Sequence, residues 1–142
     1  MTRTIRLALV LTAALGALVA AAAEHRVDLG GIYLCEGINP DGTPYKGVVE
    51  ITPTADTYLV RWTMSEQLTT GVGIFSGGVL AVSYFGNTPG VVVYRREGSR
   101  LVGQWTMGSS NGQVYAETLT KLPKQLRDRL KREGPSALRS GD

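Results

Sequence analysis

From Gly31 onward the sequence is a succession of short apolar segments separated by turn-forming residues. Gly, Asn, Asp and Pro dominate the links, and these residue types supply the positive or preset φ that tight turns need. Every link is far shorter than the dozen or more residues that a parallel crossover requires. The sequence therefore predicts an antiparallel up-and-down meander of eight strands, at residues 31–37, 45–53, 57–65, 69–76, 79–85, 90–96, 100–107 and 113–120.

This meander has one apolar face and too little helix to cover it. Closing the sheet on itself buries that face and removes the exposed strand edges. We therefore expect an all-β fold in which the meander forms a small barrel, whose interior has room for side chains or for one small ligand. An open sheet rolled against the C-terminal helix is the alternative.

The chain changes character at its C-terminal end. Residues 122–134 place leucines four positions apart, with a proline near the start and Gly-Pro at the end, which predicts a short helix after a barrel domain of residues 24–121. Residues 121–142 carry a net charge of +4, against −3 for residues 24–120. The helix could contact an anionic envelope surface or simply be solvated. The basic side chains proposed for this surface are Lys124, Arg127, Lys131 and Arg132, and residues 135–142 are expected to be disordered.

The N-terminal segment has the pattern of an export signal. Arg3 and Arg6 precede a 17-residue apolar run that ends in three alanines at Ala23. A basic start, a short apolar stretch and small terminal residues predict a signal peptide of residues 1–23, cleaved after Ala23. The protein is then expected to be periplasmic or secreted. A lipid-facing barrel is disfavoured because the strands are short and their outer positions are polar.

Period-two alternation assigns side chains to the interior of the barrel. One phase of the strands carries most of the aromatic residues and a single acid. We expect this group either to fill the lumen or to form the wall of a small-molecule pocket, for which a volume of about 300 Å³ or more is typical. The candidate ligand-binding residues are Tyr33, Tyr58, Trp62, Tyr84, Tyr94, Trp105, Tyr115 and Glu117.

The sequence offers little for catalysis or metal binding. His25 is the sole histidine and stands near the start of the expected mature chain, where it is a poor general base. Cys35 is the sole cysteine, which excludes an intramolecular disulfide and predicts either a buried thiol or an intermolecular or redox contact. Residues 39–42 are better explained as a turn than as a calcium loop. We therefore expect no enzyme, cofactor or resident metal, and no nucleic-acid partner.

A set of short segments between about residues 30 and 120 forms a combined pattern. The segments are residues 31–42, 45–47, 71–73, 94–95, 103–105 and 117–119, with Trp62. Together they resemble a family of small exported bacterial proteins, whose members are mostly uncharacterised and some of which are labelled fibronectin-binding proteins. At the level of fold the meander is also similar to avidin-like and lipocalin-like barrels.

These observations lead to two functional expectations. The first is an exported, non-enzymatic β-barrel that binds a small apolar or aromatic molecule in the lumen or at its mouth. The second is an adhesion or envelope-interaction protein that contacts a host matrix protein or an anionic surface through its outer face and basic helix.

Overall fold

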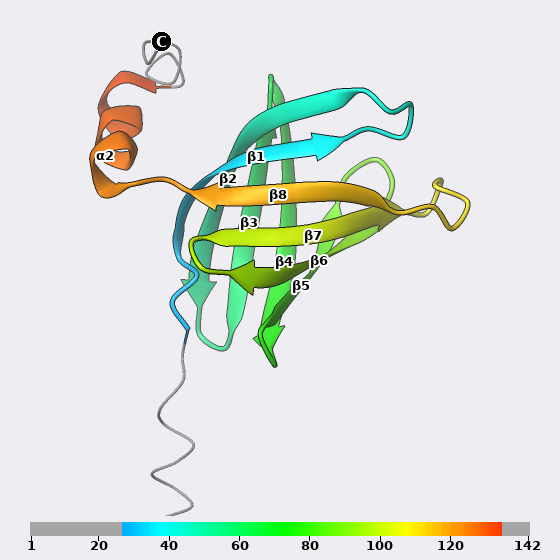
Figure 1. The fold of residues 1–142 in the computed structure, drawn as a ribbon, viewed down its shortest axis with the longest axis horizontal. Helices are drawn as coiled ribbons and strands as arrows, with labels where there is room; N and C mark the ends of the chain where they lie inside the picture. The colour runs from blue at the N-terminus through cyan, green and yellow to red at the C-terminus, as the bar shows by residue number, and fades with distance from the viewer. Residues whose placement is uncertain (1–26, 135–142) are drawn as a thin grey trace, which may run out of the picture.

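The computed structural model describes residues 27–134, so the predicted signal peptide and the predicted disordered tail lie outside the described residues. The described chain forms a closed barrel of eight antiparallel strands in sequential order, followed by one helix (Figure 1). This confirms the predicted all-β meander. The strands are β1 (Gly31–Ile38), β2 (Pro44–Thr54), β3 (Thr57–Met64), β4 (Gln67–Ser76), β5 (Val79–Phe85), β6 (Gly90–Glu97), β7 (Arg100–Met107) and β8 (Tyr115–Lys121).

Pairing between the first and last strands closes the barrel. Tyr33 lies opposite Lys121 and Gly37 lies opposite Glu117 in the β1–β8 ladder. Every strand therefore has two hydrogen-bonded neighbours, which leaves no open sheet edge and shows that the alternative of an open rolled sheet is wrong.

The strand boundaries differ from the predicted ones by at most two residues. β4 begins two residues earlier than predicted, at Gln67, and β8 begins two residues later, at Tyr115, because residues 108–114 form a longer connection. Within that connection the Gln113 amide donates to the Ser110 carbonyl, which builds a turn where sequence alternation alone predicts strand. At the opposite extreme, β4 and β5 are joined by Gly77 and Gly78 alone, with φ of 57° and 82°. Two positive φ values in succession match the tight hairpin that suits strand twist.

Inward aliphatic side chains form the buried core of the barrel. Strand alternation holds throughout, so inward aliphatic residues meet at the centre and are nearly inaccessible to solvent. The core is built from Val49, Ile51, Val60, Leu80, Val82, Val92, Leu101 and Leu119, with Cys35 and Tyr94 among them.

One end of the barrel is closed by the residues that precede β1. Leu29 is only 2% exposed and belongs to the buried core. Two tyrosines hold this segment in place, because the Tyr33 hydroxyl donates to the Leu29 carbonyl at 2.7 Å and the Tyr58 hydroxyl donates to the Val27 carbonyl at 2.8 Å. We call residues 27–30 the N-terminal plug.

The predicted C-terminal helix is present as α2 (Lys124–Glu133). Leu122 anchors its base, since this side chain is buried and its amide donates to the Ile32 carbonyl at 2.9 Å. The helix ends at Gly134, whose φ of 68° favours glycine. Figure 1 shows α2 projecting beyond the barrel wall, at the end of β8. No helix within residues 27–134 has the length and apolar character needed to cross a membrane.

Candidate functional site

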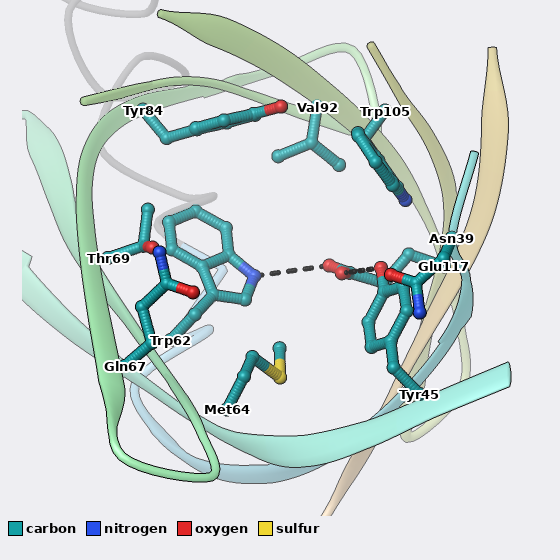
Figure 2. A pocket seen from close by; sticks show the side chains of 10 residues that line it. All are labelled: Asn39, Tyr45, Trp62, Met64, Gln67, Thr69, Tyr84, Val92, Trp105 and Glu117. Carbon is teal, nitrogen blue, oxygen red and sulfur yellow. Dashed lines mark hydrogen bonds between the residues drawn. The ribbon is translucent and has the colours of Figure 1, made fainter. Parts of the chain in front are cut away.

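The end of the barrel opposite the N-terminal plug contains a pocket. Its volume is about 220 Å³, smaller than the roughly 300 Å³ expected for a drug-sized ligand. Figure 2 shows side chains from the whole circumference of the barrel pointing into it. Its principal walls are four aromatic rings and one acid, namely Tyr45, Trp62, Tyr84, Trp105 and Glu117. The remaining lining residues are Asn39, Met64, Gln67, Thr69 and Val92.

Glu117 is the polar centre of the pocket. Its side chain is 5% exposed and accepts three hydrogen bonds. The Tyr45 hydroxyl donates to Oε2 at 2.5 Å, and the Trp62 indole nitrogen reaches across the pocket to Oε1 at 3.1 Å (Figure 2). The Tyr94 hydroxyl donates to the same Oε1 from beneath the pocket floor. A buried carboxylate requires such partners, and hydrogen bonds to a charged acceptor are the stronger ones.

Strand register explains how two tyrosines reach one carboxylate. In the ladders on either side of β8, Glu117 lies opposite Gly37 on β1 and opposite Gly103 on β7. One strand further out on each side, Gly37 lies opposite Tyr45 and Gly103 lies opposite Tyr94. The order around the barrel wall is therefore tyrosine, glycine, glutamate, glycine, tyrosine. We call these five residues the Glu117 girdle.

The two glycines make room for the two rings. A Cβ atom on Gly37 would stand 2.3 Å from the Tyr45 hydroxyl oxygen, and a Cβ on Gly103 would stand 2.6 Å from Cδ1 of Tyr94. Each tyrosine thus leans over its glycine neighbour toward Glu117. A larger residue at Gly37 would push the Tyr45 ring away from the carboxylate, whereas a Cβ at Gly103 would also meet the Val93 carbonyl oxygen at 2.3 Å and disturb the backbone.

The girdle tyrosines keep their protons. Burial, followed by the negative charge of Glu117, raises the pKa of Tyr94 well above its ordinary value and raises that of Tyr45 in the same direction. Both hydroxyls therefore act as donors, and the Glu117 oxygens act as acceptors. Burial also raises the pKa of Tyr84 to about 12. The Tyr84 hydroxyl donates to the Thr106 carbonyl at 2.9 Å, so it supports the pocket wall without joining the girdle.

The aromatic rings form two pairs on different sides of the pocket. Trp62 and Tyr84 meet edge to face, with centroids 6.0 Å apart and planes at 61°. Tyr45 and Trp105 meet in the same way at 6.4 Å and 64°. Trp105 also packs on Tyr115 with centroids 4.8 Å apart. Such contacts fix ring orientation, so the pocket walls are preorganised.

The indole N–H of Trp105 is a buried polar group without a hydrogen-bond partner in the described chain. Its nitrogen lies close to the Tyr45 hydroxyl, but no acceptor within residues 27–134 meets hydrogen-bond geometry with it. Figure 2 shows this nitrogen on the side of the ring that faces Glu117 and Asn39. Since buried donors in proteins are nearly always paired, a ligand acceptor that enters beside Tyr45 would give this N–H the partner it lacks.

The structure divides the eight candidate lumen residues into four groups. Trp62, Tyr84, Trp105 and Glu117 line the pocket, and Tyr94 lies buried directly below it. Tyr33 and Tyr58 do not reach the pocket, because their hydroxyls hold the N-terminal plug at the other end. Tyr115 also stays out of the pocket, since it packs behind Trp105 and donates to the Gln113 side chain.

Six lining residues lay outside the predicted set. Tyr45 is the most important of them. The sequence could have identified it as inward-facing, because it shares the alternation phase of the buried residues Val49 and Ile51 on β2. Met64 shares the phase of Trp62 in the same way. Strand alternation could not predict that Asn39 and Gln67 line the pocket, because both stand next to turns. The other two residues are Thr69 and Val92.

Reactive and metal-binding groups are sparse in this region. Cys35 is a buried free thiol, and burial together with the nearby negative charge of Glu117 raises its pKa, which disfavours the reactive thiolate. Within residues 27–134, His, Cys, Asp and Glu side chains form no group of three able to hold a metal ion.

The four predicted basic surface residues share one helix but differ in environment. Lys124 forms an ion pair with Asp128 at 2.8 Å, whereas Lys131 and Arg132 are exposed in the last turn of α2. Arg127 is half-buried and turns back toward the barrel, where its guanidinium lies beside Gly31. The helix therefore presents only part of its positive charge outward.

The fold and the pocket define a class: a small closed β-barrel that is filled at one end and has a cavity of about 220 Å³ at the other. Among solved structures, the chain is similar to a redesigned β-barrel, mFAP1, bound to DFHBI, at 16% identity and a TM-score of 0.54, covering 66% of this chain and 94% of that one. It also matches lipid binding protein 8 of Caenorhabditis elegans, at 11% identity and a TM-score of 0.49, covering 69% and 100%. A third match is the REP1-NXSQ fatty acid transporter, at 10% identity and a TM-score of 0.48, covering 68% and 97%. No protein-family model and no curated protein sequence matches the chain.

Proposed function

We propose that this chain is a non-enzymatic binding protein that holds one small molecule in the pocket at the open end of its barrel. The observation that carries this proposal is the uneven filling of the lumen. Aliphatic side chains and the N-terminal plug fill one end, whereas the other end keeps a cavity lined by four aromatic rings and a buried carboxylate. A few placed polar groups in an otherwise apolar concavity are typical of ligand sites.

The volume limits the size of the ligand. A cavity of about 220 Å³ is below the range of roughly 300–1,000 Å³ that holds drug-sized molecules. The bound molecule is therefore a small compound, or one part of a longer molecule whose remainder lies outside the barrel mouth.

A solved neighbour supports the capacity of such a barrel to bind a ligand. The mFAP1 barrel, which shares this fold at a TM-score of 0.54, is described in complex with DFHBI. At 16% identity this likeness supports a shared fold only. The ligand class of this chain is therefore inferred from its own pocket residues.

Intrinsic fluorescence tests the proposal without a label. The chain has two tryptophans, Trp62 and Trp105, and both line the pocket. We expect a library of small compounds to contain molecules that change this emission in a saturable way. Thr69→Phe should abolish the response by filling the pocket, whereas Thr52→Phe, at an exposed position of β2, should retain it. A library without any saturable response in the folded protein would contradict the proposal.

An interaction surface on the outside of the barrel is the second candidate function. Adjacent strands β4, β5 and β6 present exposed apolar side chains on their outer faces, where patches of this kind mark protein contacts. The residues are Val72, Ile74, Phe85, Val91 and Val93. Together with α2, this face supports the reading as an adhesion or envelope-interaction protein. Ile74→Ser with Phe85→Ser, and separately deletion of residues 122–142, should weaken binding to envelope or matrix preparations if the surface is used.

We also infer that the protein is exported, acting in the periplasm or outside the cell. The support is the pattern of residues 1–23 described above. The mass of the mature protein tests this inference, since cleavage after Ala23 would leave Glu24 as the first residue. A mature protein that retains Met1–Ala23 inside the cytoplasm would contradict it.

A further inference from the structure

We infer that the pocket selects a small organic cation that also carries a hydrogen-bond acceptor, such as an alkylammonium compound with a hydroxyl group. This inference rests on the proposed function, because it names the ligand class of the same pocket. Three features of the described residues carry it: the charge of the lining, the arrangement of the aromatic rings and the free Trp105 N–H.

The lining contains one acid and no base. Among its ten residues Glu117 is the sole carboxylic acid, and Lys, Arg and His are absent from the set. The basic side chains nearest in sequence lie on the outer faces of the strands, where Lys46 pairs with Glu36 and Arg61 pairs with Glu50. Glu117 therefore accepts three neutral donors but has no positive partner within the described chain. A buried acidic group in this situation is stabilised by a cation that enters from outside.

The donors around the carboxylate are all neutral. Oε1 accepts from Trp62 and Tyr94, Oε2 accepts from Tyr45, and the Cys35 thiol also lies within hydrogen-bond reach of the carboxylate. These donors account for about all four lone-pair positions of a carboxylate, but none of them carries a positive charge. The pocket can therefore still gain the charge of an ammonium group near Glu117, whereas a further anion would be repelled.

The aromatic walls favour the same charge. The Trp62–Tyr84 pair and the Tyr45–Trp105 pair stand on different sides of the cavity, as Figure 2 shows. Rings around a cavity attract a cation through their negative faces, and tryptophan does so best. An anionic ligand would instead face four ring systems and Glu117 without a basic side chain in the lining to offset its charge.

The free N–H of Trp105 adds a second requirement. This buried donor lies in the pocket wall without an acceptor from residues 27–134. A ligand hydroxyl, ether or carbonyl oxygen would satisfy it, so a cation with such an oxygen should bind better than a purely hydrocarbon cation. The pocket would thus recognise two features of one small molecule, its positive charge and its hydrogen-bond acceptor.

A set of probes with matched shapes tests the inference by calorimetry on the full chain. Choline supplies the cation and the hydroxyl, tetramethylammonium supplies the cation alone, and the carbon isostere of choline supplies the shape and hydroxyl without the charge. The branched carboxylate of the same shape supplies a negative charge. We expect choline to bind at least about tenfold more tightly than its neutral isostere, tetramethylammonium to bind less tightly than choline, and the carboxylate not to bind.

Two variants separate the contributions. Trp105→Phe keeps the ring and removes the donor, so it should reduce the preference for choline over tetramethylammonium to less than about twofold. Glu117→Gln should remove the preference for choline over its neutral isostere. Glu117→Gln places an amide NH₂ donor next to the Tyr45, Trp62 and Tyr94 donors, so the variant is at risk of misfolding, and circular dichroism checks its fold. If it does not fold, the wild-type probe series still tests the inference.

The outcomes distinguish this inference from the proposed function. If the neutral isostere or the carboxylate binds as tightly as choline, the cation inference is overturned and the pocket remains a small-molecule site. If these probes and the whole compound library all fail to bind, both proposals are overturned.

Discussion

Gly37 shows how much of this site depends on a missing side chain. It separates Tyr45 from Glu117 in the strand register, and the Tyr45 ring occupies the space that a Cβ would take. Gly103 has the same role toward Tyr94 on the other side of Glu117. The hydrogen bonds of the Glu117 girdle are therefore determined by two residues that contribute no polar atoms to it.

We predict that Gly37→Ala breaks the Tyr45–Glu117 hydrogen bond. The new Cβ would meet the movable end of the Tyr45 side chain, so the ring can swing away while the backbone stays in place. The expected loss is about 1.5–3 kcal/mol of unfolding free energy, the range for a hydrogen bond to a charged group. Denaturant unfolding measures it. Gly86→Ala is the matched control, since a Cβ there meets only the Thr88 carbonyl at 3.9 Å, and equal losses in the two variants would contradict the account.

Buried tyrosines predict a loss of stability at alkaline pH. Burial raises the pKa of Tyr84 to about 12, with the charge of Glu117 as the second cause, and burial likewise raises that of Tyr33 to about 12. The folded state thus holds these protons more tightly than the unfolded state, whose tyrosines titrate near 10. The stabilisation is complete below pH 10 and is lost as the pH rises toward 12. Urea midpoints across this range should fall steadily, and a constant midpoint up to pH 12 would contradict the burial of these hydroxyls.

At the scale of elements, alternation and turn chemistry were sufficient to predict the meander. Each strand buries one phase of side chains, and every link is a hairpin, so local sequence carries almost all the information. The inward position of Glu117 follows from the same rule on β8. Local patterns could not tell which end of the lumen is filled, because that depends on residues 27–30 folding back onto Tyr33 and Tyr58. This explains why two predicted pocket tyrosines belong to the closed end.

The N-terminal plug should contribute to the stability of the barrel through the buried side chain of Leu29. Leu29 packs into the buried core, so Leu29→Ala should lower the unfolding free energy by about 2–5 kcal/mol. Leu68→Ala provides the control, because Leu68 is 62% exposed and should change stability by about 0.5 kcal/mol or less. Thermal or denaturant unfolding compares the two. Similar small effects at both positions would show that residues 27–30 do not close the barrel in solution.

The whole molecule combines a rigid barrel with an asymmetric lumen. Closure leaves no free strand edge, and the core and N-terminal plug fill the end from which α2 extends. The unfilled end brings together residues from all strands from β2 to β8, and their cross-strand partners hold them in place. Periodicity predicted Trp62, Tyr84, Trp105 and Glu117 as inward residues, but the empty volume between them depends on side-chain sizes on all strands at once.

We propose above that a small molecule binds in the pocket, where it would occupy the space between Glu117 and Trp105. The chain has two tryptophans, so a ¹H–¹⁵N spectrum of the folded protein shows two indole N–H resonances that report directly on the pocket. On titration with a bound compound, we predict a saturable shift of the Trp105 resonance as its unpaired N–H gains an acceptor, with a smaller shift for Trp62, which already donates to Glu117. Saturable binding that leaves both indole resonances unmoved would place the ligand elsewhere and contradict the account.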